Sequence, residues 1–304
     1  ACINKFEQMV NTVITGTIMC SNDGLSKYAG GIIFNKNLLL VGDEMQDLDE
    51  NYMQAIIRLC EDRYVDFYMV GDKLQSIKTE KNSFTYVSNN ECSNTIKFIK
   101  PPPENKVMRF SDQKLIDFVN DVIPFKHYSL PCIEKHPDNT NLSINSNIII
   151  FEGISNNLFY EKTGPKNEHK IIMEVETLMN YYKAEVENNN CKPEDFLVVT
   201  PFTKNNPLVE AFNLAIREFW ILKYKNYNYE KYSIFHKSED GCVIDLNESN
   251  KSTRMVSIHT SKGDGRNVVV VIGISEQALK VYSEKSNNLI YDSLLHVAFT
   301  RMKQ

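Results

Sequence analysis

Two adjacent carboxylates follow an apolar run early in the chain. The stretch Leu38–Asp47 reads LLLVGDEMQD, which places Asp43 and Glu44 just after four aliphatic residues and a glycine. A short continuous apolar run is typical of a buried strand, and functional groups of open α/β sheets collect beyond the carboxyl ends of the strands. Carboxylates at that place suit a nucleotide phosphate and its Mg²⁺. The plainer interpretation is a polar helix start, since acidic residues are common in a first helical turn.

Helical and strand patterns alternate along the chain. The apolar run is followed by a helical pattern at Asp49–Arg63, with its apolar residues on one face, and by a strand pattern at Val65–Asp72. This alternation predicts an α/β fold with parallel, doubly wound sheets. The later patterns are a helix from about Ser111, a strand at Ser146–Glu152, a helix from about Glu168, a strand at Phe196–Thr200, a helix at Leu208–Phe219, strands at Met255–His259 and Asn267–Gly273, and a helix at Asp292–Arg301.

Length and composition predict two domains. The chain has 304 residues and is 42% hydrophobic, enough to bury substantial cores. Three consecutive prolines at Pro101–Pro103 form a stiff segment suited to a boundary, so we expect domains at residues 1–103 and 104–304. The net charge of −5 argues against a uniformly basic nucleic-acid binder. A motor that binds the nucleic-acid backbone in one local channel does not need a positive net charge over the whole chain.

Cysteine usage and hydropathy indicate the cellular compartment in which the protein is expected. The seven cysteines form no C-x-x-C pair, so we expect neither a zinc site nor a disulfide framework, and a reducing, intracellular location in the cytoplasm or nucleus. No apolar run reaches the ~18–20 residues of a membrane span, and no signal peptide is recognisable. Asn-, Lys- and Tyr-rich runs such as KYKNYNYEKY at Lys223–Tyr232 point to an AT-rich genome, as in some viruses. We expect that the sequence is truncated at both its N-terminus and its C-terminus.

Six segments in a fixed order resemble a known family. Together they are similar to motifs II to VI of superfamily 1 helicases of the UvrD/Rep type. The resemblance implies two RecA-like P-loop NTPase domains, the first incomplete, that use ATP and Mg²⁺ to move along single-stranded nucleic acid, expected to be DNA. The segments are GDEMQDL (Gly42–Leu48), MVGDKLQSI (Met69–Ile77), NKVMRFS (Asn105–Ser111), FLVVTPFTKNNPLVEAF (Phe196–Phe212), VSIHTSKGDGRNVVVVIG (Val256–Gly273) and LLHVAFTRMK (Leu294–Lys303).

The resemblance assigns roles at the ATP site. Asp43 matches the carboxylate that holds Mg²⁺, partly through water, and Glu44 the one that orients or deprotonates the attacking water. Gln75 matches the glutamine that senses the γ-phosphate. Two arginines, Arg109 and Arg301, match the arginine fingers of the second domain. The same motifs place Gly263 at the cofactor. Taken singly, the glutamine could be a turn residue and each arginine a solvated surface charge.

A second set of residues matches the nucleic-acid channel. Short hydroxyl and basic side chains in loops can hold backbone phosphates without reading sequence. The alternative is ordinary turn chemistry, in which serine, threonine and glycine are common. The matched residues are Thr200, Phe202, Thr203, His259, Thr260, Ser261, Lys262 and Thr300.

The sequence departs from the family in two motifs. Lys78 stands where relatives carry a base-stacking aromatic residue, and Phe84 or Tyr86 could supply that face instead. The usual K-G-L-E-F is replaced by KGDGR, so Asp264 or Arg266 would change the contact near the ribose.

The phosphate cradle is missing from the sequence. A P-loop reads G-x-x-x-x-G-K-[ST], and none of the 12 glycines is followed by lysine. We therefore expect the P-loop upstream of these residues. Two hypotheses stand, an ATP-dependent helicase or translocase and a catalytically degenerate nucleotide-binding scaffold in a replication or repair complex.

Overall fold

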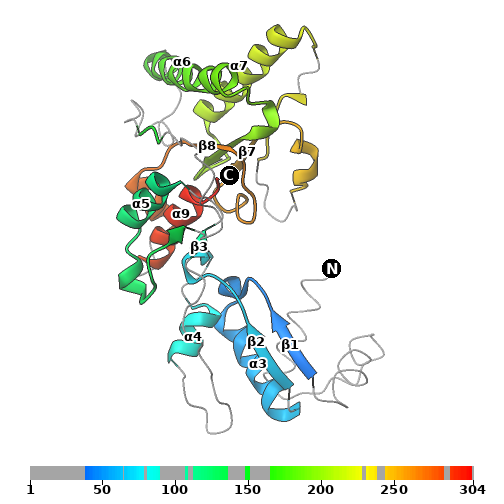
Figure 1. The fold of residues 1–304 in the computed structure, drawn as a ribbon, viewed down its shortest axis with the longest axis vertical. Coiled ribbons are helices and arrows are strands. Elements are labelled where there is room, and N and C mark those ends of the chain that lie inside the picture. Colours follow the sequence, from blue (N-terminus) through cyan, green and yellow to red (C-terminus); the bar gives the residue numbers. More distant parts are fainter. Residues whose placement is uncertain are drawn as a thin grey trace. The chain divides into compact units, whose positions relative to one another are not determined.

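The chain forms two compact units, seen in a computed structural model (Figure 1). One contains residues 1–102 and 285–293, the other residues 103–284 and 294–304. The interpretation of these units as two ATPase domains stays a prediction. The structure describes residues 38–63, 65–78, 81–89, 107–108, 112–135, 148–150, 165–227, 231–237, 244–283 and 288–302.

The first unit contains a parallel strand–helix–strand motif. Strands β1 (Leu38–Gly42) and β2 (Val65–Met69) pair in parallel and are linked by helix α3 (Glu50–Arg63), which confirms the predicted α/β pattern here. The strand ends are level, because Gly42 lies opposite Met69. Short 3-10 turns η1 (Met45–Asp47) and η2 (Lys73–Gln75) follow the two strands, and helix α4 is Ser83–Asn89.

One face of this strand pair packs on a small core. Met45, Met53 and Val87 are buried there, and Phe67 packs against them. On β1, however, Leu39 and Val41 are more than half exposed. The expectation of a fully buried strand is therefore wrong for these two side chains. Parallel sheets are normally covered on both faces, so the exposure of Leu39 and Val41 departs from that pattern.

The second unit is built on a four-stranded sheet in the order β6-β7-β5-β8. All three neighbouring pairs are parallel, as the alternating pattern predicts. Helices α6 (Pro165–Asn188) and α7 (Pro207–Tyr224) lie side by side and share a core with the sheet (Figure 1). The strands are β5 (Phe196–Thr200), β6 (Ser233–Phe235), β7 (Thr253–Ser257) and β8 (Val268–Val271).

Shorter elements complete the described part of the chain. Helix α5 (Gln113–Val122) starts at the Asp112 side chain, which accepts hydrogen bonds from the amides of Lys114 and Leu115. The predicted strand at Ser146–Glu152 is absent at its described residues 148–150, which have no strand partner. The remaining short elements are the strands β3 (Val107–Met108) and β4 (Glu134–Lys135), the helices α8 (Glu276–Ser283) and α9 (Leu289–Phe299), and the 3-10 turns η3 (Phe125–Tyr128), η5 (Pro193–Asp195) and η7 (Leu246–Ser249).

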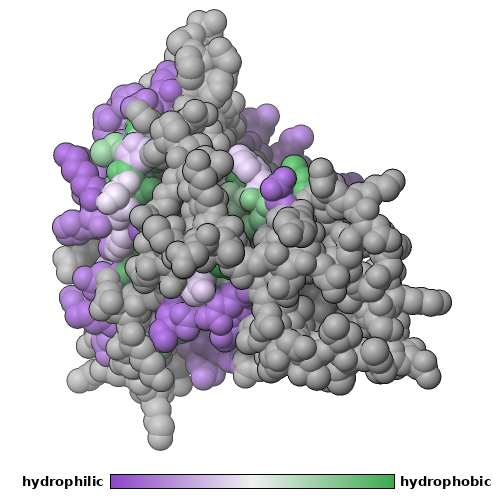
Figure 2. Space-filling model, turned by 90° about the horizontal axis from the view of Figure 1, so that it is seen from below, coloured by the Kyte–Doolittle hydropathy of each residue, from purple (hydrophilic) through white to green (hydrophobic). Residues whose placement is uncertain are grey.

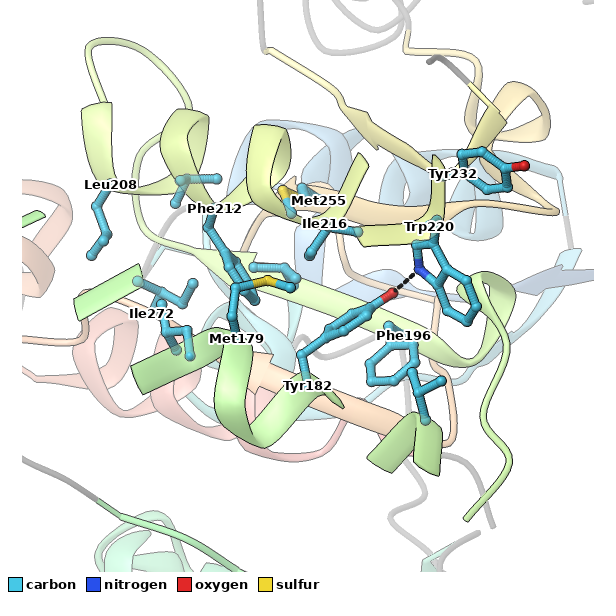
Figure 3. Close-up of a cluster of buried hydrophobic side chains, with 14 of the residues drawn as sticks. Met179, Tyr182, Phe196, Leu208, Phe212, Ile216, Trp220, Tyr232, Met255 and Ile272 are labelled. Carbon is cyan, nitrogen blue, oxygen red and sulfur yellow. Dashed lines mark hydrogen bonds between the residues drawn. The ribbon is translucent and has the colours of Figure 1, made fainter. Parts of the chain in front are cut away.

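A chain of hydrogen bonds crosses the core of the second unit (Figure 3). Trp220 Nε1 donates to the Tyr182 hydroxyl at 2.7 Å, and that hydroxyl lies 2.7 Å from Thr253 Oγ1. The threonine in turn donates to the carbonyl oxygen of Pro193. Burial raises the pKa of the Tyr182 hydroxyl, so it keeps the proton that it donates. The tyrosine ring also stacks on Phe196 with centroids 3.9 Å apart.

Replacing Trp220 by alanine is expected to lower the free energy of unfolding by about 3–5 kcal/mol, because it leaves a large cavity in a fully buried site. It also removes the donor to Tyr182. Urea unfolding followed by far-UV circular dichroism measures the change, since Trp220 is the single tryptophan. Leu222→Ala, on the exposed side of α7, is the control and should change the free energy by under about 0.5 kcal/mol.

One face of the molecule shows the polarity of the described surface residues. On the face in Figure 2 the coloured residues are mostly hydrophilic, with smaller apolar areas between them. Among the residues that the structure describes, no helix combines the length and the apolar character that crossing a membrane requires.

Candidate functional site

The two carboxylates lie just beyond the carboxyl end of β1. Asp43 and Glu44 are both exposed, and the Glu44 amide donates to Asp43 Oδ1 at 2.8 Å. Glu44 has a φ of 56°, a left-handed conformation that is uncommon for a residue with a side chain. Such strained residues cluster at functional sites. The acidic pair is therefore held in a defined turn that remains open to a ligand.

A hydrogen-bonded relay connects this turn to the end of β2. Gln46 Nε2 donates to Glu44 Oε2 at 2.6 Å, and Gln46 Oε1 accepts from the Asp72 amide at 3.1 Å. Asp72 Oδ2 in turn accepts from Gln75 Nε2 at 3.0 Å. Glu44 and Gln75, 31 positions apart in the sequence, are thus joined through the Gln46 side chain and through the backbone amide and side chain of Asp72.

The middle of this relay is tightly enclosed. Gln46 is 1% exposed, and a Cβ added at Gly71 would lie 2.2 Å from Gln46 Oε1. A side chain at Gly71 would therefore displace the glutamine. Sequence reasoning missed Gln46 and Asp72, although both lie inside the motif segments. The signal that could have found them is the level pairing of β1 and β2, which brings both strand ends together.

The acidic turn fits a magnesium nucleotide. Mg²⁺ usually keeps several waters and takes one or two carboxylates together with substrate phosphates. Asp43 and Glu44 offer such a pair on an exposed turn. Within the described residues no group of three or more His, Cys, Asp or Glu side chains could hold a metal alone.

The proposed replacements for the stacking aromatic residue are partly buried in the first unit. Phe84 and Tyr86 lie on α4, are half-buried, and pack against the small core around Met45. Lys78, at the family position, is exposed. Stacking of either ring on a base stays a prediction.

In the second unit, the two predicted nucleic-acid segments meet at the carboxyl edge of the sheet. Strands β5 and β7 are neighbours, and the Ile258 amide donates to the Thr200 carbonyl oxygen at 2.9 Å. The turn after β7 is closed by the Ser261 amide, which donates to the Ser257 carbonyl oxygen at 2.9 Å. The segments at residues 200–203 and 259–262 thus form one surface.

Four of the predicted contact residues are buried in this surface. Thr200 Oγ1 accepts from Asn206 Nδ2, Ser261 Oγ donates to the Ile258 carbonyl oxygen, and Thr300 Oγ1 donates to the His296 carbonyl oxygen. Thr203 is buried as well. In this arrangement the hydroxyl groups of Thr200, Ser261 and Thr300 bond within the turns and helix ends, and a contact of these residues with nucleic acid stays a prediction.

The remaining predicted residues are partly exposed and lie beside an aromatic cluster. The rings of Phe202 and Tyr282 stack with centroids 5.3 Å apart, and the His259 ring lies 4.8 Å from Tyr282. The Tyr282 hydroxyl donates to the Pro201 carbonyl oxygen at 2.8 Å, which fixes α8 against the loop. Thr260 and Lys262 are partly exposed on the adjoining turn. Sequence reasoning missed Tyr282 because it did not predict α8.

The unusual KGDGR segment is explained by a buried network of arginines. Arg254 Nη1 pairs with Asp264 Oδ2 at 2.6 Å, and its other nitrogens donate to Ser249 Oγ and to the Leu246 carbonyl oxygen. Arg266 donates to the carbonyl oxygens of Ser249 and Ser252. Burial, together with the nearby charge of Arg254, lowers the pKa of Arg266 to about 10. Asp264 and Arg266 are thus both part of a largely buried polar network.

Arg301 also lies inside this region. It is 3% exposed, and its Nε donates to the Val297 carbonyl oxygen at 2.8 Å. Its Nη atoms donate to Thr300 Oγ1 at 3.1 Å and, at longer range, to the Ser261 and Asp264 carbonyl oxygens. The guanidinium therefore joins the end of α9 to the turn after β7. A role at a γ-phosphate, which stays a prediction, would require it to leave these carbonyl groups.

Gly263 and Arg109 are the two remaining residues that the sequence predicts at the ATP site. Gly263 has a φ of 79° and is exposed, and a Cβ there would meet no atom within 4 Å. Its conformation favours glycine, while the space around it is open. Arg109 lies outside the described residues.

No family model and no curated protein matches this sequence. The family resemblance consequently rests on the motif residues themselves. The structure adds how these residues are arranged inside each unit.

Proposed function

We propose that these residues form most of the motor of an ATP-dependent helicase or translocase of the superfamily 1 type, with two RecA-like domains that act on single-stranded DNA. The observation that carries the proposal is the relay from Glu44 through Gln46 and Asp72 to Gln75. An ATPase needs a carboxylate near the attacking water and a donor near the γ-phosphate, at one edge of one sheet. The relay supports the proposal because it brings residues of two separate motif segments together at the ends of β1 and β2.

Each residue of the relay has a role in this proposal. Mg²⁺ held by Asp43 with the phosphates would supply charge neutralisation. Glu44 would orient the attacking water and accept its proton, and the hydrogen bond from Gln46 keeps the carboxylate in place. Gln75 would donate to the γ-phosphate after exchanging its bond to Asp72. The phosphate cradle would have to come from a P-loop outside these residues.

The aromatic cluster and Lys262 would hold the single strand. Basic groups attract the phosphates, and exposed aromatic faces stack on bases without selecting among them. Phe202, His259 and Tyr282 come from three different segments and are joined by ring contacts and by the bond to Pro201. Such prior ordering lowers the entropy cost of binding.

A second candidate is a nucleotide-binding scaffold without catalysis. One observation favours it, namely that Arg301 is buried and bonded to carbonyl oxygens of its own unit. An arginine finger must reach the γ-phosphate, so this arrangement is not the catalytic one. The two candidates differ in whether ATP is turned over.

Replacing Lys262 by alanine is expected to weaken single-strand binding by about three- to tenfold at 0.1 M salt, because one phosphate contact is lost. The loss should be equal for different sequences, and the slope of log affinity against log salt should fall by about 0.7. Fluorescence anisotropy with labelled oligonucleotides of two compositions measures both quantities. Lys126→Ala, an exposed site on η3, is the matched control. A loss confined to one sequence would contradict the proposed backbone contact.

A further inference from the structure

The carboxyl-terminal end of α7 carries a group of exposed tyrosines and lysines that the proposed motor does not use. We propose that this group is a second binding surface for single-stranded nucleic acid, separate from the aromatic cluster at Phe202. We call it the α7 terminal patch, and it consists of Lys223, Tyr224, Lys225, Tyr227, Lys231 and Lys251.

The patch lies at the opposite end of the sheet from the proposed strand-binding edge. Helix α7 starts after the 201–206 loop and its 18 residues span about 27 Å. It ends beside Trp220, which packs in the core with Tyr182 and Phe196 at the amino end of β5 (Figure 3). The two surfaces are therefore distinct regions of one unit, and a ligand at one does not occupy the other.

The tyrosines of the patch are exposed, and one of them is held in place. The Tyr224 ring stacks on Trp220 with centroids 5.2 Å apart and an angle of 11° between planes, and it also contacts the Tyr232 ring. Half of Tyr224 nevertheless remains exposed, and Tyr227 is 78% exposed. An aromatic side chain fixed on a buried tryptophan loses little entropy when it stacks on a base.

The lysines of the patch come from two segments that the fold brings together. Ser252 Oγ donates to the Lys231 carbonyl oxygen at 2.8 Å, which places Lys251 next to that part of the chain. The Lys223 ammonium lies over the rings of Phe219 and Trp220, 5.7 and 5.8 Å from their centroids. Within the described residues none of the four patch lysines forms an ion pair.

Single-stranded nucleic acid fits this surface better than other anionic partners. Lysines are available for phosphates, and tyrosine faces are available for unstacked bases. A duplex keeps its bases stacked and would leave the tyrosine faces unused. An acidic protein segment would pair with the lysines, but it would gain little from the tyrosine faces. Lysines at a helix end also favour the helix dipole, a role that requires no exposed tyrosine nearby.

The test measures binding of fluorescein-labelled oligo-dT to the 304-residue chain without ATP. The triple variant K223Q/K225Q/K231Q is expected to bind about tenfold more weakly at 0.1 M salt, with the salt slope reduced by about 2. Tyr227→Ala should weaken binding at least about fivefold through lost stacking. The matched controls are K114Q/K126Q/K170Q, which removes the same charge from exposed sites, and Tyr181→Ala on α6.

The same measurements in a Lys262→Ala background separate the two surfaces. A larger fold-loss for the patch variants in the Lys262→Ala background than in the unmutated chain would support a second, separate surface, whether or not the chain proves to be a motor. Affinity and salt slope of the triple variant equal to those of the charge control would overturn the proposal. Poly-L-glutamate that binds as tightly as oligo-dT, with Tyr227→Ala affecting neither ligand, would also overturn it, because the patch would then recognise any polyanion.

Discussion

Replacing Asp264 by alanine is expected to lower the free energy of unfolding by about 3–5 kcal/mol, because the change leaves a buried charge without its partner. Arg254 is buried, and Asp264 Oδ2 lies 2.6 Å from its Nη1. The guanidinium also holds Ser249 and Leu246, so its displacement would disturb the turn before β7. Urea unfolding followed by Trp220 fluorescence and circular dichroism measures the loss.

Two further variants make this result specific to the ion pair. Asp117→Ala removes an exposed carboxylate on α5 and should change the free energy by under about 0.5 kcal/mol. Arg254→Met combined with Asp264→Leu should recover much of the stability lost in the single variant, because apolar pairs of similar volume often replace buried ion pairs without loss. A cost below about 1 kcal/mol for Asp264→Ala would show that the pair does not organise this region.

The parallel arrangement of the strands could be predicted from the sequence. Alternating apolar runs and amphipathic helices are strong local signals, and β5, β7 and β8 lie where such runs occur. The three-residue strand β6 was missed because a strand this short, after a tyrosine- and lysine-rich run, has no detectable period. At residues 148–150 the apolar pattern alone did not form a strand, since a strand also requires a hydrogen-bonded neighbour.

The site could be predicted by residue type but not by orientation. The motif order located Asp43 and Glu44 correctly beyond a strand end. Sequence cannot tell which hydroxyl groups are buried, and it did not predict that the Thr200 hydroxyl accepts from Asn206 Nδ2 or that the Ser261 hydroxyl donates to the Ile258 carbonyl oxygen. The contacts of Gln46 with Asp72 depend on strand register and side-chain packing, which are tertiary properties.

Replacing Glu44 by glutamine is expected to reduce ATP turnover by about 10²–10⁴-fold, in a chain that also carries a G-x-x-x-x-G-K-[ST] segment upstream. The substitution removes the proton acceptor, while the new amide oxygen can still accept the hydrogen bond from Gln46 Nε2. Binding of the magnesium nucleotide should persist, because the cradle and Asp43 supply most of it. Steady-state phosphate release and nucleotide affinity, measured on the same preparation, give the two quantities.

Phosphate release stimulated by single-stranded DNA tests the proposed motor most directly. The comparison uses the P-loop-containing chain, its Glu44→Gln variant and its Glu50→Gln variant, which removes an equal charge from the first turn of α3. We expect turnover that rises with oligo-dT in the first and third proteins and is lost in the Glu44→Gln variant, with nucleotide affinity kept throughout. Nucleotide binding without stimulated turnover in the unmutated chain, or full turnover in the Glu44→Gln variant, would contradict the proposed motor.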